Sequence, residues 1–273
     1  MKAILFNAHS DEGHSRRLDV VLDLVRAFDG HLTLLNAVPY EAAASADPYG
    51  AAFAAMVPVW REEARKLREE TEKDLANEDV PWDWIDKAGP VSLALLQNSS
   101  LADLIVLGER DPTIRGKTPS FTAGELAVTA GCPVLVLPDE CERLDFDKPA
   151  LVAWDGSAEA SHALRAAVPL LKRASSVCLV SVRTKKSRKK DTLDLPPIRG
   201  ADYLSRYGIK SEVVEVDEGD EDTAHALRNA ADVRDVGLVV MGAYGRTRIS
   251  EWIFGGVTRA MLSDVGVPLL LRH

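Results

Sequence analysis

The sequence predicts an α/β protein made of two tandem copies of one domain, each a parallel sheet with helices on both faces. Three observations support this. The chain has 273 residues, which suits two domains of ordinary size better than one. Short apolar runs alternate with longer segments of helical period along the whole chain. The second half also repeats the elements of the first in the same order.

The internal repeat is visible in three pairs of segments. ILFNAHS at 4–10 matches LVAWDGS at 151–157, LIVLG at 104–108 matches LVVMG at 238–242, and GCPVLV at 131–136 matches GVPLLL at 266–271. The offset between partners changes along the chain, so loops differ in length while the elements keep their order. A repeat of half the chain predicts two similar domains.

The strands are expected at the apolar runs, because strands of a parallel sheet covered on both faces read as nearly continuous hydrophobic segments. In the first half we predict strands near residues 2–8, 31–38, 82–87, 103–108 and 133–137. In the second half we predict strands near residues 149–154, 176–182, 210–216, 236–242 and 267–271. The intervening segments predict about four helices in each half.

The helix between the second and third strands has the clearest pattern. One stripe recurs at steps of four and three, namely Trp60, Ala64, Leu67, Thr71 and Leu75. Oppositely charged residues four apart, Glu62 with Lys66 and Glu69 with Lys73, add support. This predicts an amphipathic surface helix that packs on its inner stripe.

The boundary between the domains is expected within residues 138–149, a charged stretch with a proline at each end. The first domain is therefore assigned to residues 1–140 and the second to residues 148–273.

Composition and charge narrow the classes of partner. With 42 acidic and 33 basic residues the net charge is −9, which repels nucleic-acid backbones and anionic lipid. No apolar stretch approaches the roughly 18 residues of a membrane helix, and the N-terminus does not resemble a signal peptide. Cys132, Cys141 and Cys178 are odd in number and scattered, which argues against a disulfide framework or zinc site. We therefore expect a cytoplasmic protein without nucleic-acid or membrane partners.

The most informative segment spans residues 239–259. A strand ends at Gly242, Gly245 follows in a loop, and the pair Gly255-Gly256 opens the last helix. Glycines let backbone N–H groups approach a ligand, and a helix N-terminus carries partial positive charge, so a di- or triphosphate would fit. Arg246 and Thr258 would add a cation and a hydroxyl. The same spacing also suits glycines that only shape turns and close helix packing.

This segment resembles a known signature. The ATP-binding pattern G-x2-G-x9-G-[ST] of the universal stress protein family is read here as Gly242, Gly245, Gly255 and Gly256. The turn Asp155-Gly156-Ser157 is similar to that family's other nucleotide-facing turn. The resemblance covers the whole chain as a tandem of two domains, more clearly in the C-terminal half. It implies Rossmann-like, five-stranded parallel sheets of order 3-2-1-4-5, with a ligand crevice between strands 1 and 4.

The resemblance also implies a set of binding residues. Ala153, Trp154 and Asp155 would hold the adenosine, with the Val182 backbone beside the adenine edge. The pocket would continue through Met241, Gly242, Gly245 and Arg246, and the phosphates would be cradled by Gly255, Gly256, Val257 and Thr258. The implied cofactor is ATP with Mg²⁺.

One position departs from the signature. The family usually has Ser or Thr where this chain has Gly256, so a hydroxyl donor is missing while the backbone N–H remains. A neutral hydrogen bond contributes about 0.5–1.5 kcal/mol, or roughly 2- to 13-fold in affinity. The substitution weakens the ATP prediction without removing it.

The first half departs further. Ala8 stands in the position of Asp155, Asp111 in that of Gly245, and Ser120-Phe121 in that of Gly255-Gly256. A carboxylate that faces phosphate and a phenyl ring that fills the cradle would both oppose binding. We therefore expect a degenerate and empty copy of the site.

Other candidate motifs are weaker. Gly116-Lys117-Thr118 is not a P-loop, because Asp111 replaces the required glycine. His9 and His14 are five apart, which does not suit a helical metal pair, so a solvated turn is expected. The basic run from Arg183 to Lys190 follows a strand, and a solvated loop is expected there, although binding of nucleic acid, anionic lipid or phosphate groups would also suit its charge.

Three functions remain open. The first is a universal stress protein whose C-terminal domain binds ATP and acts as a nucleotide-responsive regulator or scaffold in stress response. The second is a scaffold that needs no nucleotide, and the third is a slow ATPase. No nucleophile paired with a base stands out, so no catalytic residue and no protein metal ligand is assigned. The resemblance also implies that the last strands, Val134–Leu137 and Leu269–Arg272, pair and form an intrachain pseudo-dimer, as single-domain members of the family do between chains; a homodimer is the alternative.

Overall fold

The computed structural model describes residues 1–38, 48–111, 118–184, 196–244 and 256–273. Five strands lie in the first half: β1 (Ala3–Asn7), β2 (His31–Val38), β3 (Trp82–Ala88), β4 (Leu104–Gly108) and β5 (Val134–Leu137). Five lie in the second: β6 (Ala150–Ala153), β7 (Val177–Arg183), β8 (Ser211–Asp217), β9 (Leu238–Gly242) and β10 (Leu269–Arg272). Every one coincides with a predicted strand.

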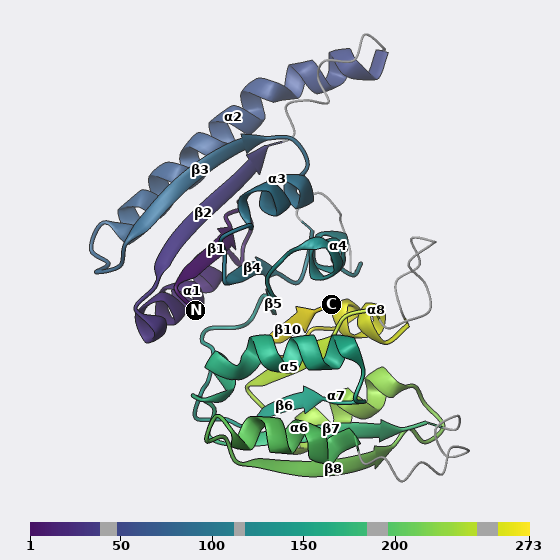
Figure 1. Ribbon diagram of the computed structural model, residues 1–273. Coiled ribbons are helices and arrows are strands. Elements are labelled where there is room, and N and C mark those ends of the chain that lie inside the picture. Colours follow the sequence, from purple (N-terminus) through teal and green to yellow (C-terminus); the bar gives the residue numbers. More distant parts are fainter. Residues whose placement is uncertain (39–47, 112–117, 185–195, 245–255) are drawn as a thin grey trace.

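The ten strands form one sheet with the order β3-β2-β1-β4-β5-β10-β9-β6-β7-β8. Counted within its own half, each set of five has the order 3-2-1-4-5, and all neighbours within a set are parallel. The two halves lie one above the other in Figure 1. The predicted Rossmann-like α/β class and strand order are therefore confirmed.

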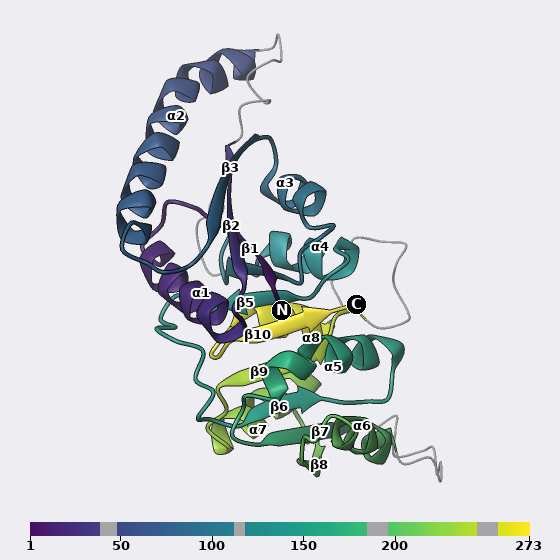
Figure 2. The same cartoon turned by 60° about the vertical axis from the view of Figure 1, so that its left-hand side comes forward.

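Eight helices in the described ranges cover both faces of the sheet. In the first half α1 (His14–Phe28) and α2 (Pro48–Leu75) lie on one face, and α3 (Val91–Asn98) and α4 (Phe121–Thr129) on the other (Figure 2). In the second half α5 (Ala158–Leu171) and α6 (Pro196–Ser205) continue the face of α1 and α2, whereas α7 (Thr223–Val233) and α8 (Gly256–Ser263) continue the other. None of these helices has the length and apolar character that a membrane crossing requires.

The core consists of two apolar layers, one on each face of the sheet. Alternate residues of a strand point to opposite faces, so Ile4 and Phe6 of β1 join one layer while Leu5 joins the other. Because helices cover both faces, the central strands are apolar at nearly every position. This is why the sequence shows them as continuous runs.

The predicted helix stripe is also confirmed. In α2, Leu67, Thr71 and Leu75 are buried. On the outer face Arg65 pairs with Glu62 and Glu69, at 2.6 and 2.5 Å.

The two halves join through their last strands, as the family resemblance implies. β5 and β10 pair antiparallel, with Leu135 opposite Leu270. Arg272 donates hydrogen bonds to the carbonyls of Ala130 and Cys132, and the His273 N–H donates to Ala127 O at 3.1 Å. The two sets of parallel strands therefore run in opposite directions at this junction, and one chain forms a pseudo-dimer.

Candidate functional site

A cavity of about 520 Å³ lies beyond the carboxyl ends of β6, β7 and β9. Its volume is within the range of small-molecule pockets, roughly 300–1,000 Å³. β6 lies between β7 and β9, so the chain leaves this strand at the point where the strand order reverses. Open parallel sheets bind their ligands in the crevice at such a position.

Nine of the twelve residues that the sequence nominates line this cavity. They come from four separate segments of the chain: Ala153, Trp154 and Asp155; Val182; Met241 and Gly242; and Gly256, Val257 and Thr258. Gly245, Arg246 and Gly255 lie outside the described residues.

The turn after β6 is built by its own side chains. The Ser157 N–H donates to Asp155 Oδ1 at 2.9 Å, and the Ala160 N–H donates to Ser157 Oγ at 3.1 Å. Gly156 between them has a φ of 76°, in the left-handed region that favours glycine. Ser157 thereby caps α5, and this helix begins at the cavity.

Trp154 is tied to the neighbouring strand and to a helix. The backbone N–H of Trp154 donates to Val180 O at 2.8 Å, and its backbone carbonyl accepts from Ser181 Oγ at 2.5 Å. On the side of α6, a Cβ added at Gly200 would lie 3.1 Å from the indole ring. The ring is 6% exposed, so Trp154 is a packed wall residue.

Packing requires a glycine at one of two signature positions, Gly242, but not at the other, Gly256. A Cβ at Gly242 would lie 2.6 Å from Ala160 N and 2.7 Å from Glu159 C, distances that real Cβ atoms do not show. Gly242 therefore permits α5 to approach β9. A Cβ at Gly256 would meet nothing within 4 Å, so packing does not require a glycine there.

The start of α8 supplies donors to the cavity. The first N–H groups of a helix have no partner within it and attract anions. Thr258 is 3% exposed, and its Oγ1 accepts from the Tyr244 N–H at 3.3 Å. A hydroxyl both accepts and donates, and no donor contact of the Thr258 O–H is found among the described residues. Burial raises the pKa of Tyr244, so the phenol stays neutral.

Eight further residues line the cavity that the sequence analysis did not nominate: Ser157, Glu159, Ala160, Val180, Thr184, Thr223, Leu227 and Tyr244. For some of these residues the sequence itself contained a signal that could have identified them. Val180 and Thr184 lie two residues either side of Val182, and residues two apart share a face of a strand. Glu159 and Thr223 have no such local signal, because the fold brings their helices to the site.

The corresponding position in the first half is filled by the chain itself. Asp111 is 8% exposed, and its carboxylate accepts from Ser120 Oγ at 2.7 Å and from the backbone N–H groups of Phe121 and Thr122, at 2.6 and 3.3 Å. The carboxylate thus uses the donors at the start of α4. The expectation that Phe121 fills the cradle is wrong, because its side chain is 48% exposed and Asp111 takes that role.

A buried cation fills the crevice between β1 and β4. Arg17 is 3% exposed and donates to both oxygens of Asp11, at 2.6 and 2.7 Å, with Asp139 at 3.5 Å. A Cβ added at Gly108, the counterpart of Gly242 in the repeat, would lie 3.1 Å from the Arg17 guanidinium. In this half, an ion-paired guanidinium lies beside Gly108, the counterpart of the glycine that borders the cavity in the second half.

The expectation of a solvated turn is wrong for His14. The ring is 9% exposed, lies 3.1 Å from Thr71 Oγ1 through Nε2, and stacks on Phe6 with the ring centroids 5.7 Å apart. Burial, and then the nearby Arg17 cation, lower the pKa of His14 to about 4. Packing of α2 over α1 buries this ring, and the local sequence does not reveal that contact.

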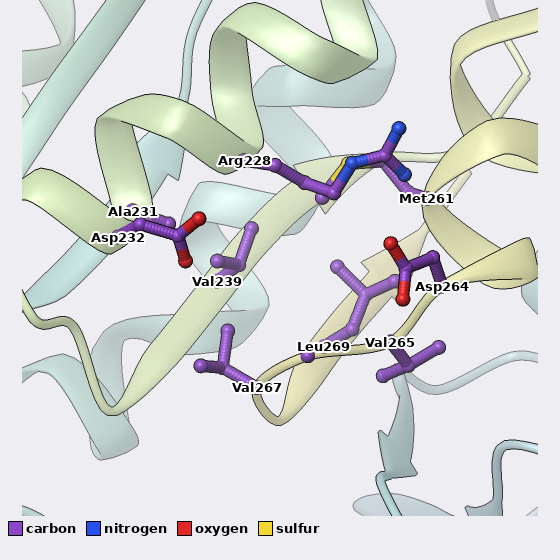
Figure 3. Close-up of a pocket in the computed structure, with 10 residues that line it drawn as sticks. Arg228, Ala231, Asp232, Val239, Met261, Asp264, Val265, Val267 and Leu269 are labelled. Carbon is purple, nitrogen blue, oxygen red and sulfur yellow. The ribbon is translucent and has the colours of Figure 1, made fainter.

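A second, smaller hollow lies at the amino ends of β9 and β10. Figure 3 shows Arg228 reaching from α7 toward Met261 of α8. Its guanidinium donates to Ala260 O at 2.8 Å. With a volume of about 110 Å³, this hollow is a seam between two helices and falls below the size of ligand pockets.

The comparisons with known proteins agree with this fold. The universal stress protein family matches residues 1–138 and 148–273. A solved universal stress protein from Archaeoglobus fulgidus DSM 4304 is 16% identical, with a TM-score of 0.73, and the match covers 99% of this chain and 97% of that one. A putative universal stress protein from Pseudomonas aeruginosa UCBPP-PA14 is also 16% identical, with a TM-score of 0.58 and coverage of 99% and 91%. No curated protein matches the chain.

Proposed function

The chain belongs to the universal stress protein family, and we propose that it binds ATP with Mg²⁺ in the cavity of its second half and acts as a nucleotide-responsive regulator or scaffold. The observation that carries this proposal is the convergence of four distant segments on one cavity of about 520 Å³ at the strand-order reversal. Adenosine would lie against Ala153, Trp154, Asp155 and Val182. The start of α8 and the Thr258 hydroxyl would hold phosphate oxygens.

The charge of the cavity supports binding as a metal complex. Asp155 and Glu159 are the charged side chains of the described lining, and both are carboxylates. A triphosphate beside them needs a counter-charge. Mg²⁺ is commonly held by phosphates together with one or two carboxylates, and when bound it would neutralise the phosphate oxygens.

Regulation would follow from linkage. A ligand that binds one conformation of a protein better than another shifts the population toward the first. Bound nucleotide would therefore report the ATP level to whatever surface recognises that conformation. We also propose that the protein works in the cytoplasm, since Cys132, Cys141 and Cys178 are unpaired and free thiols persist in a reducing compartment.

The test is calorimetry of ATP with Mg²⁺ on the wild type and on Gly245→Asp. That substitution copies Asp111, whose carboxylate takes the donors at the start of α4. We expect one site per chain in the wild type and none in Gly245→Asp. Gly131→Asp is the matched control, because it adds the same charge at an exposed glycine of the first half whose Cβ would meet nothing within 4 Å.

The second candidate is a scaffold that needs no nucleotide. The Arg17–Asp11 ion pair and the contacts of Asp111 favour it, since in the first half these side chains satisfy one another's charges and hydrogen bonds. No heat and no thermal shift at millimolar ATP would support the scaffold and refute nucleotide binding. Release of inorganic phosphate from ATP by the wild type, and its loss in Gly245→Asp, would instead identify a slow ATPase.

A further inference from the structure

Glu159 is a buried carboxylate in the wall of the cavity. It lies in the first turn of α5 and is 8% exposed. Its Oε2 is buried and has no hydrogen-bond partner among the described residues. Buried polar atoms are nearly always paired, and an unpaired charged one is costly. The orphaned oxygen is therefore an acceptor in the cavity wall whose donor the described residues do not supply.

Neighbouring polar groups of the cavity are engaged in holding the loops. Asp155 accepts from the Ser157 N–H, Ser157 accepts from the Ala160 N–H, and Thr258 accepts from the Tyr244 N–H. These contacts set the local turns. Glu159 makes no such contact through Oε2, so within the described lining this oxygen is left for recognition of a ligand.

The position of Glu159 restricts the ligand group it can meet. A Cβ built at Gly242 would lie 3.0 Å from Glu159 Cβ, which places Glu159 beside the end of β9. Glu159, the proposed adenosine wall of β6 and β7, and the start of α8 all line the same cavity. A carboxylate repels a bare phosphate and accepts from a hydroxyl. The sugar joins the base to the phosphates and carries the hydroxyl donors.

We propose that Glu159 accepts a hydrogen bond from a ribose hydroxyl of the bound nucleotide and makes the site selective for ribonucleotides. The proposal rests on the proposed function, since it concerns the same cavity. The carboxylate has a second effect. Its negative charge repels phosphate from the α5 side of the cavity, so the phosphates would bind at the start of α8 instead. A deoxynucleotide would leave the buried oxygen unpaired, and sites built for a hydroxyl reject analogues that lack it.

The test is calorimetry of ATP, 2′-deoxy-ATP and 3′-deoxy-ATP, each with Mg²⁺, on the wild type, Glu159→Gln and Glu159→Ala. We expect the wild type to bind ATP at least about 10-fold more tightly than one of the deoxy analogues, as for a hydrogen bond to a charged group. In Glu159→Ala the ratio should fall to about 1, and Glu159→Gln should lie between. Glu125→Ala, at an exposed helix position of the first half, should keep the wild-type ratio.

The outcomes separate this inference from the proposed function. Equal affinity of the wild type for all three nucleotides would overturn the role of Glu159 and leave ATP binding intact. If Glu159→Ala keeps the ribose preference but removes the Mg²⁺ dependence of ATP affinity, the carboxylate holds the metal and the ribose assignment is wrong. Absence of binding for every nucleotide would refute the proposed function, and the inference with it. Thermal unfolding of each variant verifies that it folds.

Discussion

At the scale of single residues, Gly256 bears directly on the proposed binding of phosphate at the start of α8. The position is exposed, and a Cβ there would meet nothing within 4 Å. We therefore expect Gly256→Ser to add a hydroxyl donor without strain and to raise ATP affinity roughly 2- to 13-fold, the value of one neutral hydrogen bond. Calorimetry measures the change.

Gly266→Ser is the control for this change, because Gly266 is equally open but lies in the smaller hollow. It should leave ATP affinity unaltered. Unchanged or weaker binding in Gly256→Ser would show that phosphate does not lie at the start of α8.

His14 links stability to pH. Its pKa is about 4 in the folded chain and about 6.5 when unperturbed, so below pH 6.5 the unfolded state binds a proton that the folded state does not. Stability should therefore fall as pH drops from 6.5 to 4, by about 3 kcal/mol in full. Burial also lowers the pKa of His9, which adds to the loss in this range, while the Asp11 carboxylate partly opposes it.

Urea unfolding at pH 7 and pH 4.5 measures this effect. His14→Gln keeps a polar group near Thr71 but does not titrate, so it should lose less stability over this interval than the wild type. His225→Gln changes an exposed histidine and should behave as the wild type. An identical pH dependence in His14→Gln and the wild type would contradict the assignment.

The environments of single residues were the features that the sequence predicted least well. His14 reads as part of a polar turn, because Asp11 and Glu12 precede it, yet Thr71 contacts it from 57 positions along the chain. Phe121 reads as the group that fills a cradle, whereas the buried Asp111 does so. These roles depend on how helices pack, which local patterns do not encode.

At the scale of elements, the sequence was far more informative. Strands covered on both faces are apolar at consecutive positions, so β1, β4 and β9 could be located directly from their composition. The stripe of α2 fixed its buried face for the same reason. The sequence pattern of the elements did not predict the close approach of α5 to β9. That approach is possible because Gly242 has no Cβ.

That approach gives a prediction for Gly242→Ala. The added Cβ would lie 2.6 Å from Ala160 N, so α5 must move away from β9. Overpacking of this kind costs about 1–3 kcal/mol, and the displaced α5 would carry Glu159 and Ser157 away from the cavity. We expect a lower free energy of unfolding in urea and weakened ATP binding in calorimetry.

Gly256→Ala is the matched control, since its Cβ has open space. It should change the free energy of unfolding by less than Gly242→Ala. Wild-type stability in Gly242→Ala would mean that α5 has room to adapt.

At the scale of the whole molecule, the repeat predicted two similar halves, and the antiparallel pairing of β5 with β10 makes them one sheet. Leu135 and Leu270 lie opposite each other at this junction, and both are fully buried. On the face of α4 and α8 the apolar layer is also continuous across the junction. The halves therefore share a core, and the unfolding of one removes buried contacts from the other.

This shared core predicts that a ligand bound in the second half stabilises the first. ATP at 100 times its dissociation constant should raise the free energy of unfolding by about 2.7 kcal/mol. If the halves unfold as one cooperative unit, amide hydrogen exchange should slow by the same factor in β1 and in β6. Gly245→Asp, which we expect not to bind, should show neither effect. Slowing confined to β6 would mean that the halves unfold separately, and an ATP signal could then pass only through surfaces of the second half.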